Sequence, residues 1–145
     1  MITLQKLPFP VSVNAAYANI KRSRFGPITR IKSKKYQEYD RAFSDWCLCH
    51  SKDVKEARAL VKEMGLFELH IILYLPKSRI FNKKGEIKKL DCSNFIKTCE
   101  DKITEILGFD DSRIFACSVI KTPNPENLIG SWCDVIIEEH KLSLT

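Results

Sequence analysis

The residues best suited to chemistry lie around one short predicted helix. Asp91 comes just before this helix, Lys97 lies within it, and Asp110 and Asp111 follow it after Gly108. Carboxylate oxygens are the ligands that hard divalent cations such as Mg²⁺ prefer. Nucleases commonly hold such a cation against the phosphate that they cut. The residue types and their spacing therefore favour metal-dependent hydrolysis of a nucleic acid.

The same residues also have a plain structural interpretation. Lys97 and Asp101 are spaced for an ion pair on a solvated helix face, worth about 0.2–0.5 kcal/mol. Asp110 and Asp111 are favoured in simple turns and at helix N-caps. Ser93 is a natural N-cap, since its hydroxyl can accept a hydrogen bond from a free backbone N–H. The functional interpretation requires that the acids on either side of the helix meet in space.

Length and composition limit the protein class. The chain has 145 residues and is 44% hydrophobic, which is enough for one domain over residues 1–145 with its own core. Lys and Arg number 24 against 18 Asp and Glu, so the net charge is +6. This excess favours a polyanionic partner such as nucleic acid, although many ordinary proteins are as basic. Without a signal peptide or an apolar run near the roughly 20 residues of a spanning helix, we expect a soluble, cytoplasmic protein with no membrane partner.

The cysteines do not form a recognisable metal-binding pattern. They include no Cys-x-x-Cys pair, and His50, His70 and His140 complete no zinc spacing with them. A zinc site would need ligands that this spacing lacks. We expect reduced thiols, most of them buried as small apolar side chains. The six are Cys47, Cys49, Cys92, Cys99, Cys117 and Cys133.

The first half of the chain predicts a strand, an irregular basic segment and helices. Alternating residues predict a strand over 2–7, after which prolines end it. Residues 11–29 are expected to be irregular. A helix is expected from 33 or 34 to near 50, and a further helical segment over 53–64. The apolar stripe of the first helix consists of Tyr36, Tyr39, Phe43 and Trp46.

The second half predicts three strands around one amphipathic helix. Strands are expected over 67–75, 114–121 and 132–139, a polar loop over 77–89 and a helix over 93–107. The apolar face of that helix consists of Phe95, Ile96, Cys99, Ile103, Ile106 and Leu107. Its polar face consists of Asn94, Lys97, Thr98, Asp101 and Glu105. The order β-α-(α)-β-α-β-β predicts an α/β or α+β domain with helices packed on a mixed sheet, and with Trp46 and Trp132 in the core.

Several segments, taken in order, match a known family. Leu7-Pro8-Phe9-Pro10, with Asn14 and Tyr17 after it, resembles the family's opening segment. Lys88-Lys89-Leu90-Asp91 resembles the basic lead-in to its Asp-x-Asp-Asn-x-x-Lys motif, which Asn94 and Lys97 continue. Asp101 matches a further helix aspartate, and Asp110-Asp111 the closing Asp-Asp. Over residues 4 to 139, the chain resembles the RusA family of Holliday junction resolvases.

This resemblance implies a small bacterial or phage endodeoxyribonuclease of DNA recombination and repair. It implies that Asp91 and Asp111, helped by Asp110, hold Mg²⁺, with Mn²⁺ as a substitute, and that Lys97 assists the chemistry. Three residues near that site would support it: Ser93, Asn94 and Asp101. A four-way junction needs two matched nicks, so the resemblance also implies a homodimer with two-fold symmetry.

One position departs from the family pattern. Ser93 stands where the motif has its second aspartate, which removes one negative charge from the implied metal site. The change is compatible with natural variation, with a degenerate enzyme or with a substitution that traps an inactive form. A protein that binds branched DNA with weak or no cleavage is therefore a second hypothesis. A basic RNA- or protein-binding domain unrelated to junctions is a third.

Basic residues form two candidate DNA-binding clusters. Contacts from such residues go to phosphates and make binding depend on salt. The plain alternative is solvated lysines that aid solubility. Phe25 or Phe81 could enter a branch point as a wedge, although loop phenylalanines more often fold back on their own domain. The first cluster consists of Lys21, Arg22, Arg24 and Arg30, and it is extended by Lys32, Lys34 and Lys35. The second cluster consists of Lys83, Lys84, Lys88 and Lys89. Asn14 and Tyr17 are further candidates for DNA contact.

Overall fold

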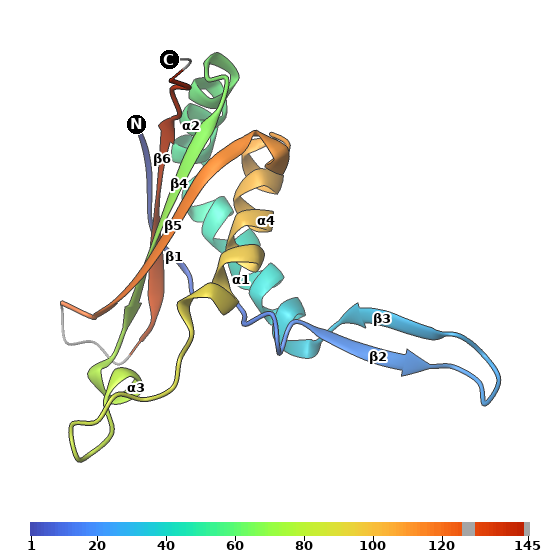
Figure 1. Ribbon diagram of the computed structural model, residues 1–145. Helices are drawn as coiled ribbons and strands as arrows, with labels where there is room; N and C mark the ends of the chain where they lie inside the picture. Colours follow the sequence, from blue (N-terminus) through green and yellow to red (C-terminus); the bar gives the residue numbers. More distant parts are fainter. Residues whose placement is uncertain (126–129, 144–145) are drawn as a thin grey trace.

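A four-stranded mixed sheet with the order β1-β6-β4-β5 lies at the centre of the computed structural model, which describes residues 1–125 and 130–143 (Figure 1). Strand β4 pairs with β5 in parallel and with β6 in antiparallel orientation, and β6 also pairs antiparallel with β1. The mixed sheet and all four of its predicted strands are confirmed. Their bounds are β1 Ile2–Pro8, β4 Phe67–Leu75, β5 Ile114–Pro123 and β6 Trp132–Glu139.

Strand β4 shows why the sheet has one covered face and one open face. Its residues alternate strictly between buried and half-buried, because successive side chains of a strand point to opposite faces. Phe67, Leu69 and Leu73 are fully buried and face the helices. Figure 1 shows helices α1 (Lys34–Cys49), α2 (Ser51–Glu63) and α4 (Ile96–Leu107) on one side of the sheet. The core lies between these helices and the sheet, which makes the fold a single α+β domain.

Helix α1 forms as the sequence predicts. Ser33 caps it by accepting a hydrogen bond from the Tyr36 backbone N–H at 3.2 Å. The apolar stripe is buried, and the helix ends where His50 takes the C-cap position. Helix α2 begins at Ser51, slightly earlier than expected, and follows α1 with little interruption.

The expectation of an irregular segment over residues 11–29 is wrong. Strands β2 (Tyr17–Lys21) and β3 (Ile28–Lys32) form an antiparallel hairpin, with Tyr17 opposite Lys32. Nearly every residue of both strands is exposed. Neither strand therefore has a buried face, and no apolar alternation marks it in the sequence. Figure 1 shows this hairpin extending away from the sheet and helices.

Two local expectations around helix α4 are also wrong. A 3-10 turn over Cys92–Phe95 precedes the helix, so Ser93 lies inside the turn, exposed, instead of capping the helix. Thr98 is buried, although the helix pattern assigns it to the polar face. Burial is possible because the Thr98 hydroxyl donates a hydrogen bond to the Val11 carbonyl at 2.6 Å. This bond ties the helix to the segment after β1, which supplies the buried acceptor that the hydroxyl needs.

Three smaller features differ from expectation. A one-turn helix, α3 (Lys77–Ile80), interrupts the predicted polar loop, and Phe81 forms a bridge with Ile87 just after it. Trp132 is only half-buried and stacks on Tyr74, whereas Trp46 is in the core as expected. All six cysteines are free of disulfides as expected, but only Cys99 and Cys133 are buried.

Among the described residues, none of the helices has the length and hydropathy needed to cross a bilayer.

A buried lysine ties helix α4 to helix α1. The Lys102 side chain is 8% exposed, and its ammonium pairs with Asp40 of α1 and, at 3.1 Å, with Glu105. Burial alone would lower the pKa of Lys102, but the hydrogen bonds that it donates to Asp40 and Glu105 outweigh burial and raise it. In the same way, bonds from Lys102 and Lys32 lower the pKa of Asp40 in spite of burial.

We expect Asp40→Asn to lower the free energy of unfolding by about 3 kcal/mol at neutral pH, because it leaves a buried ammonium poorly paired. Glu105→Gln is the matched control and should cost less than about 1 kcal/mol, since that carboxylate is exposed. The Asp40 pKa is lower in the folded protein, so its contribution is present above the ordinary value of 3.8 and is lost as pH falls further. Urea unfolding at pH 7 and pH 3 measures both effects, and equal costs for the two variants at pH 7 would contradict this account.

Candidate active site beside helix α4

The ammonium of Lys97 is the meeting point of three acidic side chains. Its Nζ lies 2.9 Å from Asp101 Oδ1, 3.1 Å from Asp111 Oδ2 and 3.8 Å from Glu100 Oε1. The ion pair between Lys97 and Asp101 is confirmed. Asp111 joins it from a different element, so the contact is more than a local pair on one helix face.

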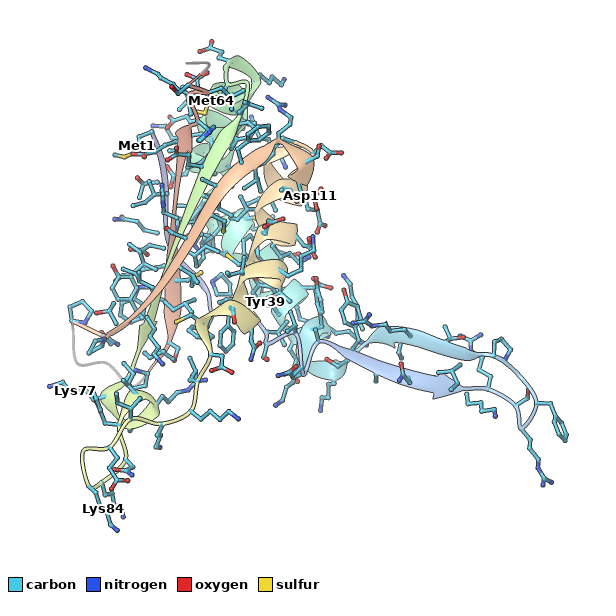
Figure 2. All side chains as sticks on the ribbon, in the orientation of Figure 1. Met1, Tyr39, Met64, Lys77, Lys84 and Asp111 are labelled. Atoms are coloured by element: carbon cyan, nitrogen blue, oxygen red, sulfur yellow. The ribbon has the colours of Figure 1, made fainter. Side chains whose placement is uncertain are left out.

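The chain after helix α4 positions Asp111 beside Lys97. Gly108 ends the helix in a left-handed conformation with φ of 75°, which favours a residue without a side chain. Phe109 is then buried and packs against Phe67 of β4, with ring centroids 4.3 Å apart. This anchor fixes the short 3-10 turn Asp111–Arg113, and Asp111 is its first residue. Figure 2 shows Asp111 on the outer side of the molecule beside α4.

The cluster keeps Lys97 positively charged. The hydrogen bonds that Lys97 donates, first to Asp101 and second to Asp111, raise its pKa well above the ordinary value. Glu100 is partly buried, and this burial is the main reason why its pKa is raised; Lys97 opposes the shift, and Asp111 and Asp101 add to it. Lys97 therefore supplies a fixed positive charge at a partly exposed point on the surface.

Asp110 and Asp111 do different things in spite of being adjacent. The Asp110 carboxylate accepts the Ser112 backbone N–H at 2.8 Å and caps the 3-10 turn. These bonds to Ser112 are the main reason why the pKa of Asp110 is lowered. The capping turn that the sequence offered as a plain alternative is thus what Asp110 forms, while Asp111 turns toward Lys97.

Asp91 lies directly before the turn that leads into helix α4. Its side chain is exposed, and its carbonyl accepts the Asn94 backbone N–H at 3.1 Å. The Asn94 carbonyl in turn accepts the Val13 N–H at 2.9 Å, and Lys121 of β5 donates to the Leu90 carbonyl at 2.8 Å. The backbone on both sides of Asp91 is therefore held to the rest of the domain.

The three predicted metal ligands are not preassembled. Within residues 1–125 and 130–143, one set of three His, Cys, Asp or Glu side chains has ligand atoms all within 4.8 Å of one another, and it consists of Glu68, His70 and Glu138. Asp91, Asp110 and Asp111 do not form such a set. Their carboxylates are exposed, which leaves their oxygens accessible to an ion from solvent.

A groove joins the hairpin to the Lys97 cluster. It has a volume of about 390 Å³ and is lined by Val13, Tyr17, Arg30, Lys97 and Asp101. The Arg30 guanidinium lies over the Tyr17 ring, 4.0 Å from its centroid. Two candidate DNA-binding residues at the base of the hairpin therefore face two candidate active-site residues.

The remaining candidate DNA-binding residues lie further away. Lys21 ends β2, and Arg22 and Arg24 lie in the turn of the hairpin, all exposed. Lys84 lies at the lower-left tip of the molecule, well away from the hairpin (Figure 2). Asn14 is exposed and its N–H donates to Ser12. The other lysines of the second cluster, Lys83, Lys88 and Lys89, are exposed on the segment that leads toward Asp91.

Sequence reasoning missed Glu100 beside Lys97 and the group of Glu68, His70 and Glu138. Glu100 follows Lys97 by three residues, and this spacing alone could have placed it beside the lysine. The alternation Glu68-x-His70 places two side chains on one strand face, but their meeting with Glu138 depends on the register of β4 against β6. No local sequence pattern specifies that register.

A comparison with known families is consistent with this arrangement. A family model described as Endodeoxyribonuclease RusA matches residues 8–138. The chain belongs to the RusA family. Membership in this family implies a metal-dependent endodeoxyribonuclease with Holliday junction resolvase activity. No similar sequence was found among curated proteins.

The region matched to RusA contains every element of the candidate site. It begins at the end of β1, includes the hairpin, Asp91 and helix α4, and ends within β6. The groove and the Lys97 cluster are thus features of a RusA-family domain, which confirms the resemblance that the short motifs indicated.

Proposed function

We propose that this RusA-family protein is a Mg²⁺-dependent endonuclease that resolves four-way DNA junctions by paired symmetric nicks. The observation that carries the proposal is the groove in which Tyr17 and Arg30 of the hairpin face Lys97 and Asp101 of helix α4. One wall of it carries side chains suited to a nucleic acid, and the other leads to the acids around Lys97. Phosphate binding and carboxylate chemistry therefore share one surface.

Asp91 and Asp111 would hold the metal ion, and Asp110 would support them by fixing the turn that carries Asp111. These side chains fit Mg²⁺ because they offer exposed, hard carboxylate oxygens, and Mg²⁺ often uses only one or two carboxylates with water completing its shell. A bound Mg²⁺, or Mn²⁺ in its place, polarises a phosphate and lowers the pKa of a water molecule. Ser93 and Asn94 lie between Asp91 and Lys97 in the sequence, and they would support the metal-binding carboxylates.

Lys97 would act as a cation. Because the surrounding acids raise its pKa, it carries a proton at neutral pH, which suits it to stabilise negative charge. A protonated amine near the scissile phosphate stabilises the charge that develops on phosphate or leaving oxygens. Asp101 would be a positioning residue, since its carboxylate holds the Lys97 ammonium at 2.9 Å.

Basic residues would hold the junction arms by their phosphates. Arg30 lies in the groove, and Lys21, Arg22 and Arg24 extend that surface along the hairpin. Lys83, Lys84, Lys88 and Lys89 would contact a second stretch of backbone, because they lie on a separate part of the molecule. Binding of this kind weakens steeply with salt. A cytoplasmic protein of bacteria or phages would meet such junctions during recombination and repair.

A homodimer follows from the symmetry of the substrate. Two nicks placed symmetrically on a four-way junction need two equivalent active sites, which a two-fold dimer provides. Sedimentation with and without junction DNA tests this point. A protein that stays monomeric on the junction yet makes paired cuts would require a different explanation.

A second candidate is a junction-binding protein with weak or no cleavage, and Ser93 favours it. A serine in place of the family aspartate leaves one carboxylate fewer for the metal ion. The two candidates are separated by one experiment: gel-shift binding to a labelled four-way junction in Ca²⁺, followed by cleavage in Mg²⁺ and Mn²⁺. Cutting supports the nuclease, and binding without cutting supports the second candidate. A preference for RNA or linear duplex over the junction at equal salt would remove both.

Phe25 gives a prediction about how the branch point is engaged. Its side chain is 93% exposed at the turn of the hairpin, so it does not fold back on its own domain, whereas Phe81 is 38% exposed and forms a bridge with Ile87. We expect Phe25→Ala to weaken junction binding by about 5- to 150-fold, the range for loss of one aromatic stacking contact with a base. Phe25→Trp should retain binding, and the melting temperature should not change.

Competition gel shifts with junction and linear duplex measure this effect. An equal loss on both substrates would assign Phe25 to general contact, and no loss on either would remove it from DNA binding.

A further inference from the structure

The open face of the sheet carries a second group of potential metal ligands. Glu68 and His70 are two residues apart on β4, so they point to the same face. Glu138 of β6 pairs directly with Glu68. His140 follows Glu138 by two residues, and its backbone N–H still bonds to the Leu66 carbonyl at 2.8 Å. Two hydrogen-bonded strands therefore hold Glu68, His70 and Glu138 in fixed register, and the bond to Leu66 keeps His140 beside the end of β4.

The distances within this group match those around a bound ion. His70 Nε2 lies 3.5 Å from Glu68 Oε2 and 3.7 Å from Glu138 Oε2. The three potential ligand atoms all lie within 4.8 Å of one another. Around a tetrahedral Zn²⁺ with bonds of about 2.0–2.1 Å, neighbouring ligand atoms lie about 3.3–3.4 Å apart. Only small side-chain movements would be needed to bring all three onto one ion.

Neighbouring side chains already orient two of the ligands. Ser118 of β5 lies opposite His70, and its Oγ is 2.6 Å from His70 Nδ1, which leaves Nε2 facing the two carboxylates. His140 Nδ1 lies 2.8 Å from Glu68 Oε1, which leaves Oε2 facing His70. Metal-binding histidines and carboxylates are commonly held through their other polar atom in this way.

Charge and exposure also fit a cation. Glu68 and Glu138 are directly opposite on neighbouring strands, a placement that like charges disfavour unless a positive charge lies between them. The side chains are partly exposed, at 30% for Glu68, 32% for His70 and 45% for Glu138, so an ion can enter from solvent. An imidazole among the ligands favours zinc and neighbouring first-row metals over Mg²⁺.

We propose that Glu68, His70 and Glu138 form a binding site for a first-row transition-metal dication, with Zn²⁺ as the best-fitting ion. His140 and Ser118 position Glu68 and His70 for it. The fourth coordination position faces solvent and takes water. The ion joins β4 to β6 on the sheet face opposite helix α4, and it is separate from the site around Asp91 and Asp111.

Zn²⁺ binding to the full chain tests this proposal. Calorimetric titration in the presence of a competing chelator should give one site per chain, and Zn²⁺ should raise the melting temperature. His70→Ala should lower the affinity at least about tenfold, since it removes the imidazole ligand, and Glu138→Gln should act in the same direction. His50→Ala is the matched control, because this histidine lies at the junction of α1 and α2, and it should leave binding unchanged.

Two spectroscopic readouts separate this site from thiol binding, since Cys49 and Cys117 are exposed. Co²⁺ in the same site should lack the intense thiolate charge-transfer band, and Zn²⁺ should shift the NMR resonance of His70 Nε2. A thiolate band, an unshifted His70 imidazole, or wild-type affinity in His70→Ala would each overturn the proposal. Mg²⁺-dependent junction cleavage is expected to persist in His70→Ala, which keeps this test independent of the nuclease activity.

Discussion

Replacing Asp111 by asparagine is expected to lower four-way junction cleavage by at least about 100-fold while leaving junction binding nearly unchanged. The substitution keeps the shape of the side chain but removes a charge that would hold the metal ion. It also removes the ion pair between Asp111 and Lys97, whose Oδ2 and Nζ atoms are 3.1 Å apart. Asp111 is 48% exposed, so the folded state should tolerate the change. Asp91→Asn should give a loss of similar size, because it removes the other carboxylate ligand.

Single-turnover cleavage of a synthetic junction in Mg²⁺ measures these losses, and gel shifts in Ca²⁺ measure binding. Glu105→Gln is the matched control, since this acid is on the same helix but pairs with Lys102 instead of Lys97. Equal nicking by wild type, Asp91→Asn and Asp111→Asn would remove both aspartates from the chemistry. An equal loss in Glu105→Gln would point to general charge on the helix and not to a specific site.

Restoring the family aspartate at position 93 is expected to give the largest gain in Mg²⁺-dependent junction cleavage. Ser93→Asp adds a carboxylate two residues after Asp91 at an exposed position. The added charge should lower the Mg²⁺ concentration for half-maximal cleavage by about tenfold or more and raise the rate, because divalent-ion affinity follows the number of charged ligands. If the wild type binds the junction without cutting it, this variant should create cleavage.

Ser93→Asn is the control, since it has nearly the same size as the aspartate variant without the charge. A Mg²⁺ titration of the cleavage rate for all three proteins measures the effect. No gain in Ser93→Asp would mean that Ser93 does not mark a lost ligand, and an equal gain in Ser93→Asn would assign the effect to shape.

Some of the site can be derived from sequence because its determinants are local. The pair of Lys97 and Asp101 follows from helix spacing, and the cap at Asp110 follows from the turn preference of aspartate. The strand over residues 67–75 follows from its apolar character and the proline that ends it. Each of these depends on residues within about one turn or one strand of one another.

Other parts depend on tertiary contacts that no local pattern contains. The hairpin of β2 and β3 has no buried face, so its strands lack the alternation that marks β4. Thr98 is buried because Val11, far away in sequence, supplies an acceptor for its hydroxyl. Ser93 does not cap helix α4 because a 3-10 turn displaces the start of the helix to Ile96. The meeting of His70 with Glu138 requires a strand register that only the folded sheet sets.

The central claim is that Asp91 and Asp111 share a metal ion beside Lys97. A crystal structure of the protein soaked in Mn²⁺, with the ion located by its anomalous scattering, tests this claim most directly. The account predicts an ion bound by Asp91 and Asp111, and loss of that ion in Asp111→Asn. Manganese found only at Glu68, His70 and Glu138, or Asp91 and Asp111 turned away from a common ion, would contradict it.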